Sequence, residues 1–343
     1  MNLRAFTSAI SSTTASLPIV ILYVTSACNL RCITCSYRDA LPNELSLEEY
    51  ARLARELQGL GLRHVVLSGG EPLVRRDVPA ICKIFAALGV RQSLLTNGLL
   101  LEKRIDEISE FLDEIIVSLD APDAATHNDI RGLECFDQIL RGIEAVKGLV
   151  RRPILSLRMV VQRKNFRLLD AMVDFAKSAG VDRVSFLSAD VRSSAFHRNH
   201  AGPAAPEREI LLSAEECGEF RGLMEALVER RKPEIRSGFI SESPEKLMHL
   251  VRYFEAFHGL SDFPRNSCNA PNVSTVITST GELLPCYFLP AYGDIRSGSL
   301  QGQLNNDLAR FTRMQVRAYT LEQCRKCVCT LNVSPWSALV GRV

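Results

Sequence analysis

Three cysteines near the start of the chain have a spacing that suits a reactive iron–sulfur cluster. Cys28, Cys32 and Cys35 form the pattern CxxxCxxC, and no further cysteine occurs before Cys82. Four-iron clusters are bound by cysteine thiolates, and the electron-transfer clusters of bacterial ferredoxins use four of them. Three thiolates leave one iron without a protein ligand, so that iron can bind a substrate. The spacing therefore predicts a [4Fe-4S] cluster that takes part in chemistry.

Five more cysteines form a second group near the end of the chain. Cys268 and Cys286 lie in the pattern Cx12Gx4C around Gly281, and Cys324 and Cys327 form a CxxC pair. Four thiolates can close every ligand position of a four-iron cluster, which is an arrangement suited to electron transfer. We therefore expect a second [4Fe-4S] cluster held by these four cysteines.

Two alternatives stay open for the second group. A CxxC pair with two distant cysteines can also build a structural zinc site. Cys329 follows Cys327 after one residue and could replace it as a ligand, although CxxC is the more usual pair. The remaining cysteines fall in predicted helices and are expected to be small core residues: Cys82, Cys135 and Cys217.

Polar sequences follow three strand-like segments between the two cysteine groups. They are SGGEP at 68–72, TNG at 96–98 and SLD at 118–120. Strand and helix patterns alternate here, which predicts a parallel sheet with helices outside it. Ligands bind at the carboxyl ends of parallel strands, so these sequences and Cys28 are expected to lie at one end of the sheet.

The predicted elements divide the chain into three parts. Strands are expected over 19–25, 64–68, 92–96, 114–119, 154–162 and 183–187, and helices over 46–60, 78–88, 135–150, 167–179, 214–230 and 244–257. The first helix has a capping box of Ser46 and Glu49. Residues 273–278 and 282–284 should form a hairpin before a helix over 300–318, and 192–208 should be a flexible loop. We expect a flexible tail over 1–16, a core over 17–235, and a linker helix with a small cluster domain over 236–343.

Composition indicates a cytoplasmic enzyme. The 343 residues are 46% hydrophobic and can bury a large core, while a net charge of +2 offers no basis for binding nucleic acid or an anionic membrane. No apolar run approaches the roughly 18 residues that span a bilayer. Cysteines at cluster-ligand spacings, without a secretory signal pattern, favour a reducing compartment.

The motifs and their order resemble the radical S-adenosylmethionine (SAM) superfamily. GGEP at 69–72 is similar to the loop that holds the methionine amino group of SAM, and Ser118 to Gly132, with His127 and Arg131, resembles members that carry a SPASM or Twitch auxiliary domain. The resemblance implies an α/β fold: a partial (β/α)6 barrel with a small C-terminal Twitch-like auxiliary cluster domain. A full SPASM domain would continue with more cysteines, so one auxiliary cluster is expected.

The resemblance also implies how the first cluster is used. SAM would bind the open iron, and its reductive cleavage would produce a 5'-deoxyadenosyl radical that abstracts hydrogen from a substrate. The contacts implied for SAM are those of Gly69, Gly70, Glu71, Asn97, Ser118 and Arg131.

The strand expected over 154–162 has one polar face. Ser156, Arg158 and Gln162 alternate with apolar residues along it. If this face lines the barrel, Arg158 could bind SAM or a carboxylate or phosphate of a substrate. The alternative is that the face meets solvent or an outer helix, because parallel strands usually bury both faces.

The expected function is that of a radical SAM enzyme that oxidises a small polar molecule and receives electrons from a donor such as flavodoxin or ferredoxin. A small molecule is favoured because the segment before Cys28 is too short for a peptide-recognition domain. One alternative is maturation of a ribosomally made peptide. Another is the molybdenum-cofactor type of GTP cyclisation, favoured if only three C-terminal cysteines bind iron. A non-catalytic iron–sulfur electron carrier is the alternative from a different class.

Overall fold

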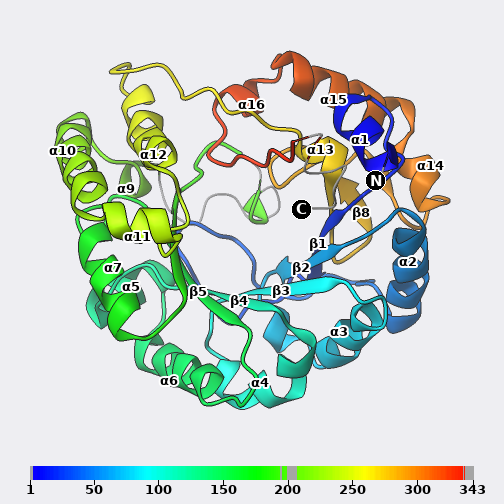
Figure 1. Cartoon of the computed structure of the whole chain (residues 1–343), viewed down its shortest axis with the longest axis horizontal. Coiled ribbons are helices and arrows are strands. Elements are labelled where there is room, and N and C mark those ends of the chain that lie inside the picture. Colours follow the sequence, from blue (N-terminus) through cyan, green and yellow to red (C-terminus); the bar gives the residue numbers. More distant parts are fainter. Residues whose placement is uncertain (1–2, 194, 199–206, 335, 337–343) are drawn as a thin grey trace.

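Six parallel strands form the framework of the fold, as predicted. The computed structural model describes residues 3–193, 195–198, 207–334 and 336. The strands are β1 (Ile19–Thr25), β2 (His64–Gly69), β3 (Arg91–Thr96), β4 (Glu114–Ser118), β5 (Ile154–Val161) and β6 (Arg183–Ser188). Each pairs in parallel with the next in the chain. Figure 1 shows the helices arranged around the outside, so the partial (β/α)6 barrel is confirmed.

Helices connect the strands and cover their outer face. They are α2 (Leu47–Gly59), η1 (Pro72–Val74), α3 (Val78–Ala86), α4 (Leu101–Ile108), η2 (Ser109–Phe111), α5 (Ala124–Arg131), α6 (Phe136–Lys147) and α7 (Leu169–Ser178). Ser46 caps α2 in a capping box with Glu49, as predicted. Apolar strand residues such as Leu67 and Leu157 share one continuous core with helix residues such as Leu53. This burial of apolar surface is the main force that holds the barrel together.

The burial of one face of β5 shows that its polar residues lie on the opposite face. The apolar residues of the strand are buried in the core that the outer helices share: Leu155, Leu157, Met159 and Val161. Ser156 on the other face donates a hydrogen bond of 3.1 Å to Glu114. Successive side chains of a strand point to opposite faces, so Ser156 and Arg158 face the inside of the barrel.

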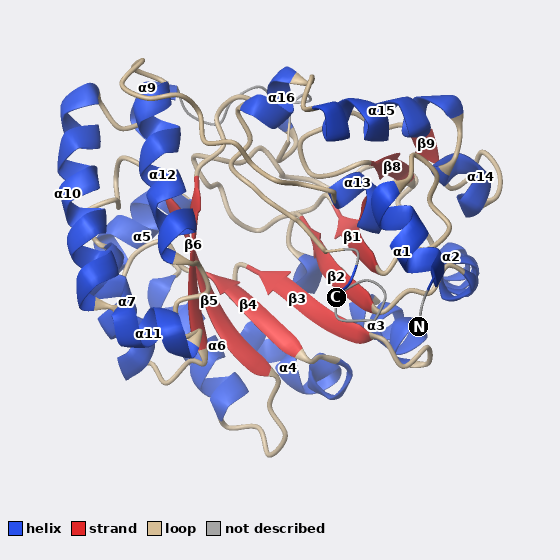
Figure 2. Ribbon diagram, turned by 45° about the horizontal axis from the view of Figure 1, so that its top comes forward, coloured by secondary structure: helices blue, strands red, loops and turns tan. Residues whose placement is uncertain are grey.

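The C-terminal part extends the same sheet. β7 (Ser274–Ile277) pairs in parallel with β1, and β8 (Glu282–Leu284) and β9 (Gly293–Asp294) follow in antiparallel, which gives a nine-stranded sheet. β7 and β8 form the predicted hairpin, with Gly281 at a φ of +101° in its turn. The auxiliary part is thus joined to the barrel by backbone hydrogen bonds (Figure 2).

Further helices follow β6, the first four on the side of β5 and β6 and the later ones near the C-terminal strands. They are α9 (Glu207–Ile210), α10 (Ala214–Arg230), α11 (Lys232–Ser237), α12 (Pro244–Ala256), α13 (Ala270–Val273), α14 (Leu300–Leu304), α15 (Asp307–Ala318) and α16 (Glu322–Arg325). The helix expected over 300–318 is two helices, because Asn306 caps α15 by accepting a hydrogen bond from the Ala309 amide. α12 packs against α10 and β6. In the expected loop over 192–208, residues 194 and 199–206 lie outside the described residues.

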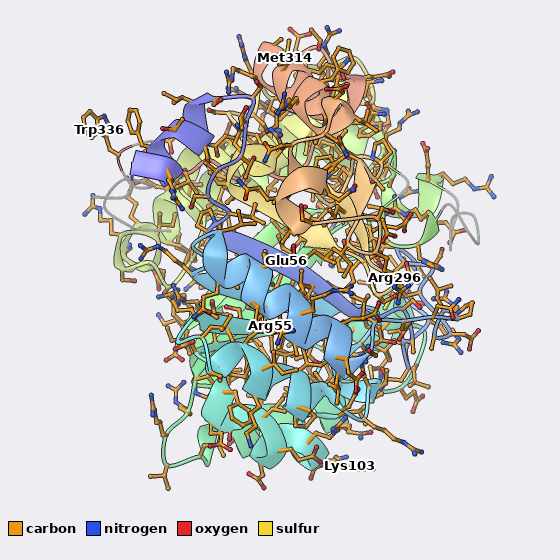
Figure 3. The ribbon with its side chains drawn as sticks, turned by 90° about the vertical axis from the view of Figure 1, so that its right-hand side faces the viewer. Arg55, Glu56, Lys103, Arg296, Met314 and Trp336 are labelled. Atoms are coloured by element: carbon orange, nitrogen blue, oxygen red, sulfur yellow. The ribbon has the colours of Figure 1, made fainter. Side chains whose placement is uncertain are left out.

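The C-terminal part also binds to the outside of α2. Arg296 forms an ion pair of 2.6 Å with Glu49, and Glu56 accepts a hydrogen bond of 2.6 Å from the amide of Leu300. Figure 3 shows Glu56 and Arg296 on this side of the molecule. In the described part of the chain, no helix has the length and apolar character needed to cross a membrane.

The expectation of a flexible tail over 1–16 is wrong for the described residues 3–16. Residues Leu3–Ile10 form α1, which packs against α13. Asn272 donates hydrogen bonds of 2.8 and 2.6 Å to the carbonyl oxygens of Ser8 and Ser11. Arg313, which is buried, donates one of 2.6 Å to Ser12. The segment is ordered because its carbonyls satisfy buried polar side chains of the C-terminal part.

Candidate active site and auxiliary cluster site

The loop after β1 brings the first three cysteines together. Its backbone is tied to α5: the amides of Arg31 and Ile33 donate hydrogen bonds of 3.1 Å to the carbonyls of Arg131 and Ile130. Burial raises the pKa of Cys28 to about 11 and that of Cys35 to about 12, and the charge of Cys32 contributes to both rises. Three mutually interacting thiols at the carboxyl end of β1 fit the donor set of a four-iron cluster.

The glycine pair after β2 allows the GGEP loop to lie against the cysteine loop. The amides of Gly70 and Glu71 donate hydrogen bonds of 2.9 and 2.8 Å to the carbonyls of Thr25 and Ala27. A β-carbon on Gly69, which has a φ of +116°, would lie 2.4 Å from the carbonyl oxygen of Thr25. One on Gly70 would lie 2.2 Å from that of Ala27. Only glycine fits at these positions.

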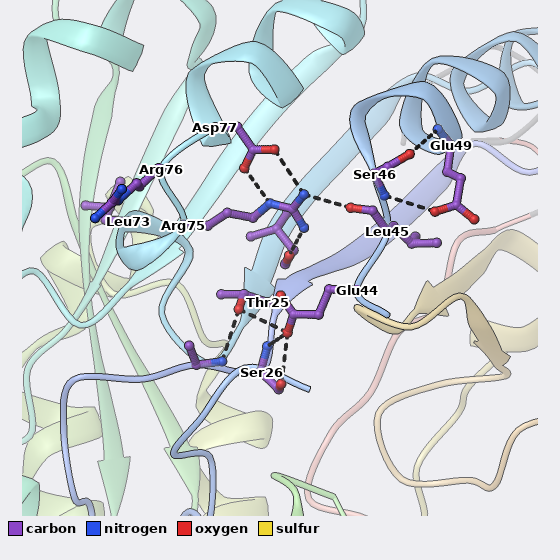
Figure 4. A network of polar contacts seen from close by, with 12 residues as sticks. Thr25, Ser26, Glu44, Leu45, Ser46, Glu49, Leu73, Arg75, Arg76 and Asp77 are labelled. Carbon is purple, nitrogen blue, oxygen red and sulfur yellow. Dashed lines mark hydrogen bonds and ion pairs between the residues drawn. The ribbon is translucent and has the colours of Figure 1, made fainter. Parts of the chain in front are cut away.

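A polar network fixes the first residues of the cysteine loop (Figure 4). Glu44 accepts hydrogen bonds from the Ser26 amide at 2.7 Å and from the Thr25 hydroxyl at 3.1 Å. Arg75, which follows η1, pairs with Asp77 and donates hydrogen bonds of 2.7 Å to the carbonyls of Val24 and Leu45. These contacts hold the end of β1 and the GGEP loop in one arrangement, which the sequence analysis did not anticipate.

Glu71 joins the ends of β2 and β3. Its carboxylate is fully buried and accepts hydrogen bonds from the Leu73 amide, the Thr96 hydroxyl at 2.8 Å and the Asn97 amide at 2.7 Å. Burial raises the pKa of Glu71 to about 7, and the hydrogen bonds oppose this rise. A cation placed beside it would favour its ionised form.

Asn97 connects the end of β3 to the cysteine loop. Its side-chain amide donates a hydrogen bond of 2.8 Å to Asn29 and lies 3.9 Å from the sulfur of Cys28. Ser118 ends β4 and is half-buried, in register with Arg158 of β5. Asn97 is therefore next to the first cysteine group, as expected of a contact at the adjacent strand end.

Arg131 belongs to a buried ion pair that the sequence analysis missed. It lies 2.8 Å from Asp120 and 3.7 Å from the sulfur of Cys32. The ring of His127 accepts a hydrogen bond of 3.2 Å from the Asp120 amide, and burial lowers the pKa of His127 to about 3. Asp120 ends the SLD sequence, and that position after a strand was the only signal for it. The neutral imidazole and the ion pair orient the Arg131 guanidinium towards the cysteine loop.

The second cysteine group lines one cavity of about 500 Å³. All five of its thiols border this cavity: Cys268, Cys286, Cys324, Cys327 and Cys329. Burial raises the pKa of Cys286 to about 12 and that of Cys324 to about 11, and the charge of Cys268 adds to both. A cavity with this many convergent thiols fits a four-iron cluster.

The geometry distinguishes Cys327 from Cys329. The Cys329 amide donates a hydrogen bond of 3.3 Å to the sulfur of Cys327. Burial raises the pKa of Cys329, and the charges of Lys246 and Arg158 oppose the rise. Cys329 is therefore the thiol of the pair on which these two cations act. Among the described residues, no three His, Cys, Asp or Glu side chains are grouped as ligands of a single metal ion.

A group of tyrosines lies between the two cysteine groups. The ring centre of Tyr23 is 6.2 Å from that of Tyr37 and 6.3 Å from that of Tyr287. Burial raises the pKa of Tyr23 well above its usual value, and both Cys35 and Cys286 contribute to this rise. The two groups therefore approach the same side chain. The sequence offered no signal for this cluster, because its members lie on β1, in the cysteine loop and after β8.

Comparisons with known proteins agree with this arrangement. The family model of the Radical SAM superfamily matches residues 22–176, and that of SPASM, an iron-sulfur cluster-binding domain, matches residues 268–328. GTP 3',8-cyclase 1 of Pseudomonas aeruginosa is 31% identical over 274 residues, which cover 77% of this chain and 78% of that protein. Fe-coproporphyrin III synthase of Methanosarcina barkeri is 30% identical over 239 residues, covering 66% and 54%.

Other relatives match over a shorter stretch. The probable GTP 3',8-cyclase of Sulfolobus acidocaldarius is 31% identical over 168 residues, covering 48% of this chain and 53% of that protein. The chain spans about half the length of this relative and of two other GTP 3',8-cyclases, at 53% and 52%.

Solved structures show the same fold at low sequence identity. SuiB of Streptococcus suis bound to SAM has a TM-score of 0.62 at 14% identity, covering 93% of this chain and 74% of that one. Native anSMEcpe with bound SAM has a TM-score of 0.62 at 16% identity, covering 94% and 88%. SuiB has also been solved bound to its precursor peptide SuiA. The cofactors of the two matched domains are SAM with a [4Fe-4S] cluster, and an additional [4Fe-4S] cluster. This chain is a member of the radical SAM superfamily with a C-terminal SPASM-type domain.

Proposed function

We propose that this radical SAM enzyme oxidises a small polar molecule and uses its second cluster as an electron acceptor. With an electron from a donor such as flavodoxin or ferredoxin, the cluster at the first cysteine group supplies the reductive cleavage of SAM to methionine and a 5'-deoxyadenosyl radical. The radical takes a hydrogen atom from a substrate carbon and leaves as 5'-deoxyadenosine. The substrate would then release a proton, and a second cluster held by the C-terminal cysteines would supply the acceptor for its remaining electron. The substrate thereby loses two electrons and two protons in all.

The observation that carries this proposal is the cavity lined by all five C-terminal cysteines. Four of them suffice to occupy every iron of a [4Fe-4S] cluster. A cluster without an open iron is suited to accept an electron and is less suited to bind a substrate directly. Tyr23 is near both Cys35 and Cys286, which supports a short path between the two sites.

The residues of the first site have separate roles in the proposal. Cys28, Cys32 and Cys35 hold the first cluster, and Glu71 with its glycine pair positions the ammonium group of SAM. Arg131 and Ser118 lie on the side expected for its carboxylate, and a guanidinium held by an ion pair can donate to that group. These roles place SAM against the GGEP loop.

The experiment separates SAM cleavage from substrate oxidation. The anaerobically reconstituted protein is treated with a strong reductant, and 5'-deoxyadenosine, methionine and the oxidation level of the product are measured. We expect Cys32→Ala to abolish cleavage, and Cys286→Ala to stop product formation while sparing some abortive cleavage. A product at the same oxidation level as its substrate would refute the oxidation, and unchanged turnover in Cys286→Ala would refute the role of the second cluster.

A second candidate is cyclisation of GTP. The Pseudomonas aeruginosa relative, whose match covers 77% of this chain, favours it. Cyclisation within one molecule gives a product of the same mass as GTP, so mass spectrometry of a reaction with GTP distinguishes the two candidates. Each of the five C-terminal cysteines can also be replaced singly and the iron content measured. Loss of iron in only three of these variants would support this candidate.

A further inference from the structure

An arginine on the inner face of the barrel has a buried guanidinium nitrogen without a hydrogen-bond partner in the described part of the chain. Arg158 lies on β5, in register with Ser118 of β4 and Ser185 of β6. Its Nε atom is buried and has no hydrogen-bond partner among the described residues. The inner faces of three neighbouring strands therefore present two hydroxyl groups beside one cation.

Two other arginines with little exposed side-chain surface are paired with a carboxylate. Arg131 is 2.8 Å from Asp120, and Arg198 is 3.0 Å from Asp190. Removing a charged group from water costs free energy unless a counter-charge or hydrogen bonds compensate. No ion pair joins Arg158 to a carboxylate among the described residues, and its buried Nε has no acceptor, which is the state expected of a donor whose partner is a bound ligand.

The surroundings of Arg158 place it towards the C-terminal domain. Burial raises the pKa of Tyr287, Cys329 and Glu242, and the positive charge of Arg158 opposes each of these rises. For Cys28, the positive charge that opposes the rise in pKa is that of Arg131. Arg158 and Arg131 thus serve different regions of the barrel interior.

The nearby acid is already bound to the protein. Glu242 is 4% exposed and accepts hydrogen bonds of 2.9 Å from the Ser185 hydroxyl and 3.0 Å from the Phe186 amide. Lys246 adds a second positive charge, since it too acts on Glu242 and Cys329. Two cations thus lie near one acid, and this excess of positive charge suits the region to an anion.

We propose that Arg158 binds an anionic group of the substrate, a carboxylate or a phosphate, between the two cysteine groups. The planar guanidinium can donate two parallel hydrogen bonds to either group, which fixes orientation as well as position. This inference rests on the proposed function and specifies its substrate class: a small molecule that carries an acidic group.

The test uses the full-length reconstituted protein with SAM present and two simple probes. Binding of inorganic pyrophosphate and of succinate is measured by calorimetry, which distinguishes phosphate from carboxylate recognition. We expect one probe to bind at a single site and Arg158→Gln to weaken it at least tenfold. Arg158→Lys should weaken it less, because charge remains while the paired donors are lost. Arg151→Gln is the matched control, an exposed arginine just before β5, and should bind the probe normally.

The affinity for SAM is the second readout. We expect it to stay within twofold in Arg158→Gln and Arg158→Lys. A tenfold loss of SAM affinity with unchanged probe binding would place Arg158 in the SAM site and overturn the proposal, as would a wild-type protein that binds neither probe. If Arg158→Gln does not fold, Arg158→Lys decides. Absence of SAM cleavage by the wild type would refute the proposed function and leave the anion site as a separate result.

Discussion

Gly70 and Ala27 are in direct backbone contact: a β-carbon on Gly70 would stand 2.2 Å from the carbonyl oxygen of Ala27. This contact joins the loop after β2 to the loop that carries the first three cysteines. Because the opposing atoms are backbone atoms, they cannot rotate away as a side chain could. The relative position of the two loops therefore depends on the absence of one side chain.

Gly70→Ala is expected to displace the GGEP loop from the cysteine loop. Overpacking of this kind costs about 1 to 3 kcal/mol of stability. We expect SAM affinity to fall at least tenfold and the iron content of the first site to decrease. Gly59→Ala is the control, since nothing lies within 4 Å of a β-carbon there. Equal behaviour of the two variants would show that the contact is not needed to position the loops.

Cysteine substitutions should separate two clusters. Wild-type protein should contain about eight iron atoms, and the triple alanine variant of Cys28, Cys32 and Cys35 about four. Cys327→Ala should lose the second cluster and Cys329→Ala should keep it, because the Cys327 sulfur already accepts an amide hydrogen bond. Iron and sulfide analysis checks this. The reverse pattern would make Cys329 the ligand, and about one zinc with one cluster in the wild type would contradict the second cluster.

Asp120→Asn should be strongly destabilising. Asp120 and Arg131 are both buried and 2.8 Å apart, and removing one member of a buried ion pair costs about 3 to 5 kcal/mol. Asp129→Asn is the control, because Asp129 is 62% exposed in its ion pair with Lys164 and such pairs contribute about 0 to 1 kcal/mol. Denaturant unfolding of the cluster-free protein measures both. A difference below about 1 kcal/mol would mean that Asp120 is not needed to compensate Arg131.

The affinity for SAM should depend on pH through Glu71. Burial raises the pKa of this carboxyl to about 7, and an adjacent ammonium group favours the ionised form. Protonation of Glu71 thus opposes binding, so affinity should fall as pH falls below about 7, by about fivefold between pH 7 and pH 6. Equilibrium binding of SAM to the reconstituted protein measures this change. Glu71→Gln should bind more weakly with a flat profile over this range. An exposed control, Glu134→Gln, should keep the wild-type profile, and a flat wild-type profile would contradict the role of Glu71.

The element pattern could be read from the chain because it is local. The strand-like segments of the sequence match all six strands of the barrel to within one residue at each end, and Ser46 with Glu49 identified the start of α2. α4 and α5 were missed, because each is only eight residues long and offers few turns from which to read a helical period. The first 16 residues were misjudged because their order depends on hydrogen bonds from Asn272 and Arg313, which are distant in sequence.

The sequence by itself determined the two cysteine groups, the glycine pair and the barrel strands, since spacing and periodicity act over a few residues. The tertiary structure decided which of these meet. Pairing of β7 with β1 carries the C-terminal cysteines to the barrel, and burial of the apolar face of β5 turns Arg158 inward. It also placed Asp120 against Arg131. Such contacts depend on which faces pack together, and that is set by the burial of the whole core rather than by any local pattern.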